Sequence, residues 1–170
     1  MKITSAYANK IIKKLGEDKE FWRKKEEQGC TYVAAIDEEP VIPEYDYGEV
    51  SQKIAGIDDR ILKLKHAINL ANCTNEIEVR GTKMTVDMIL IKMAQMNKRK
   101  TILDDMRKHE PKERVTHGMH PPKLSVPEYR YINYDLQQAT NDYESTSMQI
   151  VELQIALDKY NQTVEFEADI

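Results

Sequence analysis

The sequence has 170 residues and a formal net charge of −4, with 32% charged and 41% apolar residues, and this length favours one domain over a two-domain enzyme. Only six Gly and six Pro are present, and nine of the twelve aromatic residues are Tyr, which excludes a turn-rich all-β sandwich. No apolar run is long enough to cross a membrane, and the first residues lack the apolar region of a signal peptide. We therefore expect a cytoplasmic protein with no membrane partner, and reduced thiols at Cys30 and Cys73.

The first half of the chain predicts two long helices. Residues 5–28 have apolar positions near heptad spacing, and Gly29 is a signal for the end of a helix. Residues 30–48 contain two prolines and no sustained period, which predicts a connecting loop. A second helix over 49–72 shows a strict heptad seam, typical of coiled coils, at Val50, Ile54, Ile57, Ile61, Leu64, Ile68 and Ala71.

The second half predicts a short extended arm, two further helices and a second loop. Residues 75–82 alternate between polar and apolar residues, and Thr85 is a candidate N-cap for a helix over 85–108. The residues of this helix expected to face inward are Val86, Ile89, Leu90, Met93, Met96 and Leu103. Residues 109–127 read as a loop, and residues 129–132 as an extended arm that could pair with residues 77–79. The last helix, over 134–162, has a heptad seam at Ala139, Tyr143, Thr146, Ile150, Leu153, Leu157, Tyr160 and Val164.

Together these elements predict an all-α protein. We expect an antiparallel helical bundle or coiled coil of about four helices with a small β-hairpin arm, forming one helical domain over 1–170. Narrow apolar seams leave apolar edges open on a single chain, so we also expect a homo-oligomer.

Three segments resemble a known family. They are MKITSAYANKIIKKL at the start, HAINLANCTNEIEV with its continuation RGTKMTVDMILIK, and ELQIALDKYNQTVEF near the end. Their order and spacing are similar to those of coiled-coil proteins of bacteria and phages labelled septicolysin-like. The resemblance implies a coiled coil in which Asn69 and Asn72 close the long helix and Gly81 precedes the next one. It departs at Tyr160, which precedes Asn161 where the family has an aromatic residue after the Asn, and in the segment HGMHPP. The family label implies pore formation, which we do not carry over, because no segment here is apolar enough to insert as a helix.

Positive charge is concentrated in one segment. Residues 80–130 hold 12 Lys and Arg against 6 Asp and Glu, whereas the rest of the chain holds 13 against 23. This block is either a solvated surface that pairs with acidic helices or an anion-binding surface. Arg offers paired donors to phosphate oxygens, and Tyr rings can stack on a base. The candidate ligand-binding residues are Arg80, Lys83, Lys112, Arg114, His117, His120, Lys123, Tyr129, Arg130 and Tyr131.

No motif for nucleotide hydrolysis, a zinc protease or a nucleophile elbow is present, so we expect no enzymatic activity and no cofactor. His117 and His120 have the spacing of metal ligands, but Gly118 and the following prolines disfavour a helix that would orient them, and we expect no metal site. The overall acidity disfavours a nucleic-acid partner. From the charge and the architecture we expect a non-enzymatic oligomeric protein that binds and sequesters a small phosphorylated nucleotide-like ligand, a role that would suit a phage inhibitor of nucleotide-signalling defence. The alternative is a purely structural assembly module without a ligand.

Overall fold

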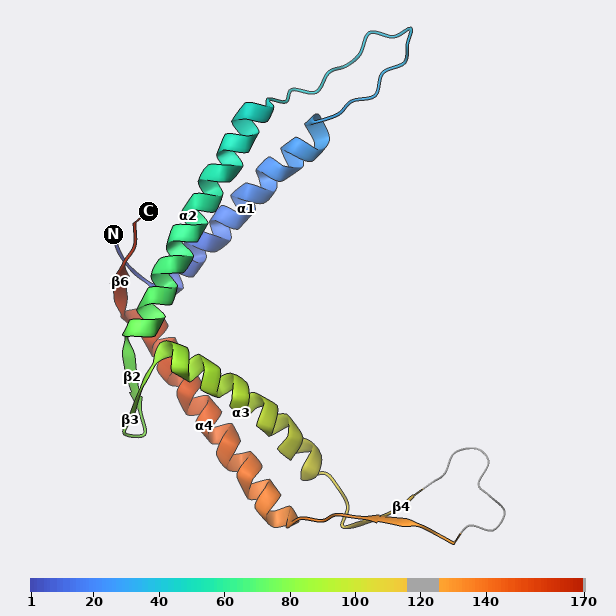
Figure 1. Cartoon of the computed structure of the whole chain (residues 1–170), viewed down its shortest axis with the longest axis vertical. Coiled ribbons are helices and arrows are strands. Elements are labelled where there is room, and N and C mark those ends of the chain that lie inside the picture. Colours follow the sequence, from blue (N-terminus) through green and yellow to red (C-terminus); the bar gives the residue numbers. More distant parts are fainter. Residues whose placement is uncertain (116–125, 170) are drawn as a thin grey trace. The chain divides into compact units, whose positions relative to one another are not determined.

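The computed structural model describes residues 1–115 and 126–169, which form four helices and six short strands (Figure 1). The helices are α1 (Ser5–Gly29), α2 (Tyr47–Thr74), α3 (Val86–Met106) and α4 (Leu136–Thr163). The strands are β1 (Lys2–Thr4), β2 (Glu76–Val79), β3 (Thr82–Thr85), β4 (Lys112–Arg114), β5 (Tyr129–Tyr131) and β6 (Glu165–Glu167). None of the described helices combines the length and the apolarity that a membrane span requires.

The prediction of an all-α bundle with a single hairpin arm is wrong. Within the described residues the strands form three two-stranded antiparallel sheets, β1–β6, β2–β3 and β4–β5, so the protein is a mixed α and β structure. Two of these sheets involve segments of three residues, which are too short to give a periodic signal in the sequence. The homo-oligomer stays a prediction.

The chain divides into two compact units. Unit 1 comprises Met1–Ile77 and Leu157–Ile170, and unit 2 comprises Glu78–Ala156. The expected single helical domain over 1–170 stays a prediction, because compactness alone does not measure whether the two units unfold together.

Unit 1 is built on the pair α1 and α2, which lie side by side (Figure 1). Its core contains Ala8 and Leu15 of α1 and Leu64 of α2, all buried, with partly buried isoleucines packed around them. The predicted seam of α2 does face inward, because Val50, Leu64 and Ala71 are buried and the seam isoleucines are half-buried. Heptad spacing keeps one narrow stripe directed at the neighbouring helix, and here that neighbour is α1.

Strands β1 and β6 join the two ends of unit 1. Their register places Ile3 opposite Phe166 and Lys2 opposite Glu167, so an apolar pair faces the core and an opposite-charge pair faces solvent. The backbone N–H of Ala168 donates to the carbonyl of Met1 at 2.9 Å. The sequence patterns did not predict this sheet, because its partners are separated by nearly the whole chain.

Unit 2 contains α3 beside the part of α4 that ends at Ala156 (Figure 1). The guanidinium of Arg107 lies 4.0 Å from the centroid of the Tyr143 ring, and the Tyr134 hydroxyl donates to the carbonyl of Met106 at 2.6 Å. Val86, Ile89 and Leu103 of α3 are buried, as are the α4 seam residues Ala139 and Leu153. Leu90, which was expected to face inward, is exposed, because it lies about 100° around the helix from the buried Ile89.

Short polar side chains begin the helices. Thr4 accepts a hydrogen bond from the backbone N–H of Tyr7 at 3.3 Å, and Asp46 accepts one from Glu49 at 3.0 Å. Thr85 accepts one from Met88 at 3.2 Å, which confirms the predicted N-cap of α3. Asp135 accepts hydrogen bonds from the first turn of α4. Each cap satisfies a backbone donor that the helix itself cannot pair.

Two leucines of α2 provide a matched test of the unit 1 core. Leu64 is 0% exposed and Leu62 is 67% exposed. We expect Leu64→Ala to lower the free energy of unfolding by about 2–5 kcal/mol, because truncation leaves a cavity in the core. The control Leu62→Ala should change it by less than about 0.5 kcal/mol. Urea denaturation followed by circular dichroism measures both, and equal effects of the two substitutions would contradict this core.

Candidate ligand-binding site

The structure separates the predicted ligand-binding residues into groups. Arg80 and Lys83 belong to the β2–β3 hairpin. A second group lies on the β4–β5 hairpin and consists of Lys112, Arg114, Tyr129, Arg130 and Tyr131. His117, His120 and Lys123 lie outside the described residues, so their assignment stays a prediction.

Strand β4 forms within residues 109–127, which the sequence led us to expect as a loop, whereas β5 lies in the extended arm expected at residues 129–132. Lys112 lies opposite Tyr131, Glu113 opposite Arg130, and Arg114 opposite Tyr129. The backbone N–H of Val115 extends the ladder by donating to the carbonyl of Glu128 at 2.9 Å. The expected pairing of residues 129–132 with residues 77–79 is therefore wrong. Pairing with β4 closes a shorter loop, and the entropic cost of loop closure rises with loop length.

Alternation along the two strands gives the hairpin two chemically different faces. Side chains of successive strand residues point to opposite faces, so Lys112 and Arg114 share one face with Tyr129 and Tyr131. The ammonium of Lys112 lies 4.2 Å from the centroid of the Tyr129 ring and 5.6 Å from that of Tyr131. A cation at this distance is attracted to the ring quadrupole, so this contact places positive charge beside two exposed aromatic rings. We call these four residues the cation–tyrosine face.

The opposite face of the hairpin carries Glu113 and Arg130. Their closest charged atoms are 3.8 Å apart and both side chains are exposed, so solvent screens this ion pair strongly. A cavity of about 140 Å³ is lined by Glu113, Arg114, Val115 and Arg130. Sites for drug-sized ligands span roughly 300–1,000 Å³, so in one chain this cavity suits a phosphate-sized group and not a whole nucleotide.

Arg80 is held by a different interaction. Arg80 and Gly81 have φ angles of 52° and 75°, and they form the two-residue turn between β2 and β3. Two consecutive positive φ angles are typical of a type I′ hairpin turn, where glycine is favoured and arginine is strained. The Nη2 of Arg80 donates to Oε1 of Glu152 at 2.8 Å, and its Nε donates to Oε2. These hydrogen bonds lower the pKa of Glu152 and raise that of Arg80, so the charge of Arg80 is already paired.

The two hairpins lie at opposite ends of α3. This helix has 21 residues, which at 1.5 Å per residue separate its ends by about 32 Å. The structure therefore does not bring Arg80 and Lys83 to the cation–tyrosine face within one chain. Sequence patterns could not show this, because the basic residues are continuous in sequence although a rigid helix divides them.

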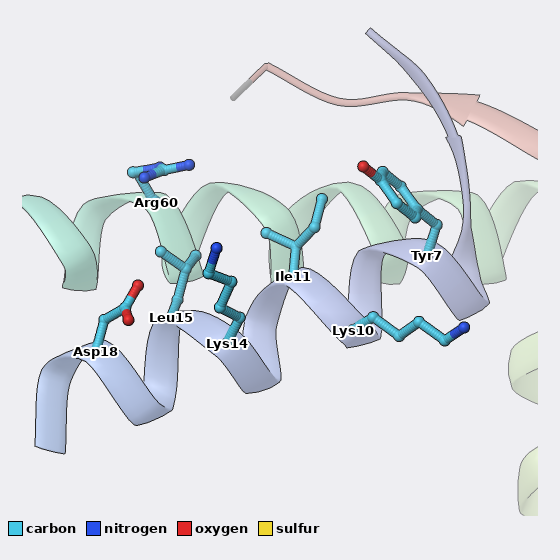
Figure 2. Close-up of a pocket in the computed structure, with 7 residues that line it drawn as sticks. All are labelled: Tyr7, Lys10, Ile11, Lys14, Leu15, Asp18 and Arg60. Atoms are coloured by element: carbon cyan, nitrogen blue, oxygen red, sulfur yellow. The ribbon is translucent and has the colours of Figure 1, made fainter.

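Sequence reasoning missed a groove in unit 1, which Figure 2 shows in close-up. It has a volume of about 320 Å³, and its lining includes Ile11, Leu15 and Lys14 of α1 and Arg60 of α2. The available signal was the recurrence of Lys10 and Lys14 next to Ile11 and Leu15, which places basic and apolar residues along one edge of a helix. Among the described residues, no cluster of three or more His, Cys, Asp or Glu could hold a metal ion.

The Arg80–Glu152 pair predicts a pH dependence of stability. The pKa of Glu152 is lower in the folded protein than in the unfolded chain. Its stabilising contribution is therefore present at neutral pH and is lost as the pH falls through the folded pKa. We expect Glu152→Gln to be less stable than the native protein at neutral pH, with the difference shrinking in acid. Urea titrations across the acidic range measure this, with the exposed Glu76→Gln as control. A difference that is independent of pH would contradict the pairing.

Comparisons with known proteins inform only the fold. No family model matches the chain, and no protein with a curated description matches it. A crystal structure of a conserved protein of unknown function from Corynebacterium diphtheriae is similar, with a TM-score of 0.65 and 14% sequence identity. The match covers 98% of this chain and 100% of the other chain, so the likeness extends over both units. The chain therefore shares its fold with this bacterial protein.

Proposed function

We propose that the protein binds and sequesters a small phosphorylated nucleotide-like ligand without turning it over. The observation that carries the proposal is the cation–tyrosine face, where the Lys112 ammonium lies 4.2 Å from the Tyr129 ring centroid. Phosphate oxygens accept hydrogen bonds from Lys and Arg, and a base stacks on an exposed aromatic ring. Both kinds of contact are available on one face of the β4–β5 hairpin.

In this proposal Lys112 and Arg114 bind the phosphate groups, and Tyr129 and Tyr131 provide the stacking surface. Arg130 lies on the opposite face of the hairpin beside Glu113, so it is not one of the residues that contact the ligand in this proposal. Arg80 takes no part, because breaking its hydrogen bonds to Glu152 would leave that carboxylate without its partner. The concentration of positive charge and the helical architecture lead us to propose a role as a cytoplasmic, phage-encoded inhibitor of nucleotide-signalling defence.

A binding titration tests this function. We expect ADP-ribose or a cyclic dinucleotide to bind with an affinity tighter than about 1 mM, measured by isothermal titration calorimetry. Lys112→Gln and Arg114→Gln should each weaken binding about tenfold, because each removes a charged donor to phosphate. Lys98→Gln, an exposed cation on α3, serves as the control and should leave binding unchanged. Absence of affinity for all ligands, or equal affinity of the three variants, would contradict the proposal.

A second candidate function, assembly, is favoured by a separate observation on α4. Besides its inward seam, this helix carries a second apolar stripe at Met148, Val151 and Ile155, which are 58%, 52% and 63% exposed. Their spacing of three and four residues places them on one helix face. Such a stripe fits a helix of a second copy of this chain, which is the homo-oligomer that the sequence led us to expect.

The mass of the native protein in solution tests the assembly function. We expect native mass spectrometry to find an oligomer, and Val151→Glu to shift it to the monomer, because a buried carboxylate without a partner disfavours association. Gln149→Glu places the same charge on another face of α4 and should leave the oligomer intact. A native protein that is monomeric at tens of micromolar, or a Val151→Glu variant that still assembles, would exclude this surface.

A further inference from the structure

The groove of unit 1 combines an apolar floor with basic edges. Ile11 and Leu15 form the floor and belong to the core of the unit, since Leu15 is buried and Ile11 packs partly buried beside it. The volume of about 320 Å³ lies at the lower end of the range for ligand sites. The lining of α1 runs from Tyr7 to Asp18, which at 1.5 Å per residue is about 16 Å along the helix. The groove is therefore elongated and suits a small, linear ligand.

Two basic residues of the groove, Lys14 and Arg60, form no ion pair with the described residues. Lys19, one turn beyond Leu15, binds Asp58 of α2 at 2.6 Å and so links the two helices. Among the described residues, by contrast, neither Lys14 nor Arg60 has a carboxylate within ion-pair distance. Lys10 also lines the groove, and the one carboxylate in the lining is that of Asp18. The lining therefore carries more positive than negative charge.

The positions of the side chains indicate where in the groove an anionic group could bind. Figure 2 shows Lys14 and Leu15 adjacent on α1 with Arg60 above them on α2, whereas Lys10 extends away from these three. A guanidinium presents two parallel donors that match a carboxylate, and a lysine adds a third donor as a point charge. The aliphatic floor lies directly beside these donors. An anionic head group at Arg60 and Lys14 would thus continue into an apolar tail over Ile11.

We propose that this groove binds an organic anion with an aliphatic body, of the class of medium-chain carboxylates. The floor is aliphatic, and the one aromatic ring in the lining, that of Tyr7, lies at the end of the groove and is half exposed. This surface offers little for a base to stack on, so the site differs in chemistry from the cation–tyrosine face. The inference does not depend on the nucleotide-binding function.

Calorimetric titration of the full chain with decanoate tests the site. We expect binding tighter than about 1 mM, with Arg60→Gln and Lys14→Gln each weakening it about tenfold. Lys13→Gln, an exposed lysine on the neighbouring position of α1, should leave binding unchanged. Acetate, which has the head group alone, and decanol, which has the tail alone, should each bind at least about tenfold more weakly than decanoate, because each lacks one half of the interaction.

Three results would overturn the proposal. The first is the absence of decanoate binding, and the second is binding of decanol as tight as that of decanoate, which would show an apolar surface without an anion site. The third is decanoate binding that Arg60→Gln and Lys14→Gln leave unchanged. Circular dichroism confirms that the variants fold, and Arg60→Lys, which keeps the charge but loses the paired donors, should bind with intermediate affinity. The Lys112→Gln variant separates the two sites, because it should lose affinity for nucleotides and keep affinity for decanoate.

Discussion

A pair of helices can bury only one stripe of each helix, and this constraint shapes both units. In unit 1 the buried stripe contains Leu15 and Leu64, and the edges of the helix pair stay open to solvent. The groove beside Arg60 lies at such an edge, where residues at the margin of the core line a surface groove. On α4 the same constraint leaves a second apolar stripe centred on Val151 exposed among the residues that the structure describes. Apolar edges stay exposed here because the core of a helix pair is thin.

The three short sheets add contacts that the helix pairs alone do not provide. Strands β1 and β6 place Ile3 in the core of unit 1 and hold its two chain ends together. The β4–β5 hairpin presents cations and aromatic rings in a fixed alternation that a flexible loop would not maintain. The β2–β3 hairpin is fastened instead by a charge pair, in which Arg80 is bound by Glu152 of α4.

The local features of the fold were predictable from the sequence, and the long-range features were not. Heptad spacing predicted the apolar seams of α2 and α4, because the repeat of apolar residues lies within a few turns of one helix. The pairing of Lys2 with Glu167 has no local signal, because each strand gains its stability from a segment far away in sequence. The site followed the same rule. Composition pointed to Lys112 and Arg114, but the hydrogen bond between Arg80 and Glu152 joins residues that are distant in sequence and has no local signal.

The order of the units along the chain has a further consequence. Unit 2 is one continuous segment, Glu78–Ala156, whereas unit 1 is split and resumes at Leu157. The architecture is thus that of an insertion, in which one block of sequence interrupts another. Changes of length inside the inserted block, including its hairpin of lysine and tyrosine residues, leave both halves of the host block in sequence order and its terminal sheet intact. The β4–β5 hairpin can therefore change in length while the fold of unit 1, with its groove, is kept.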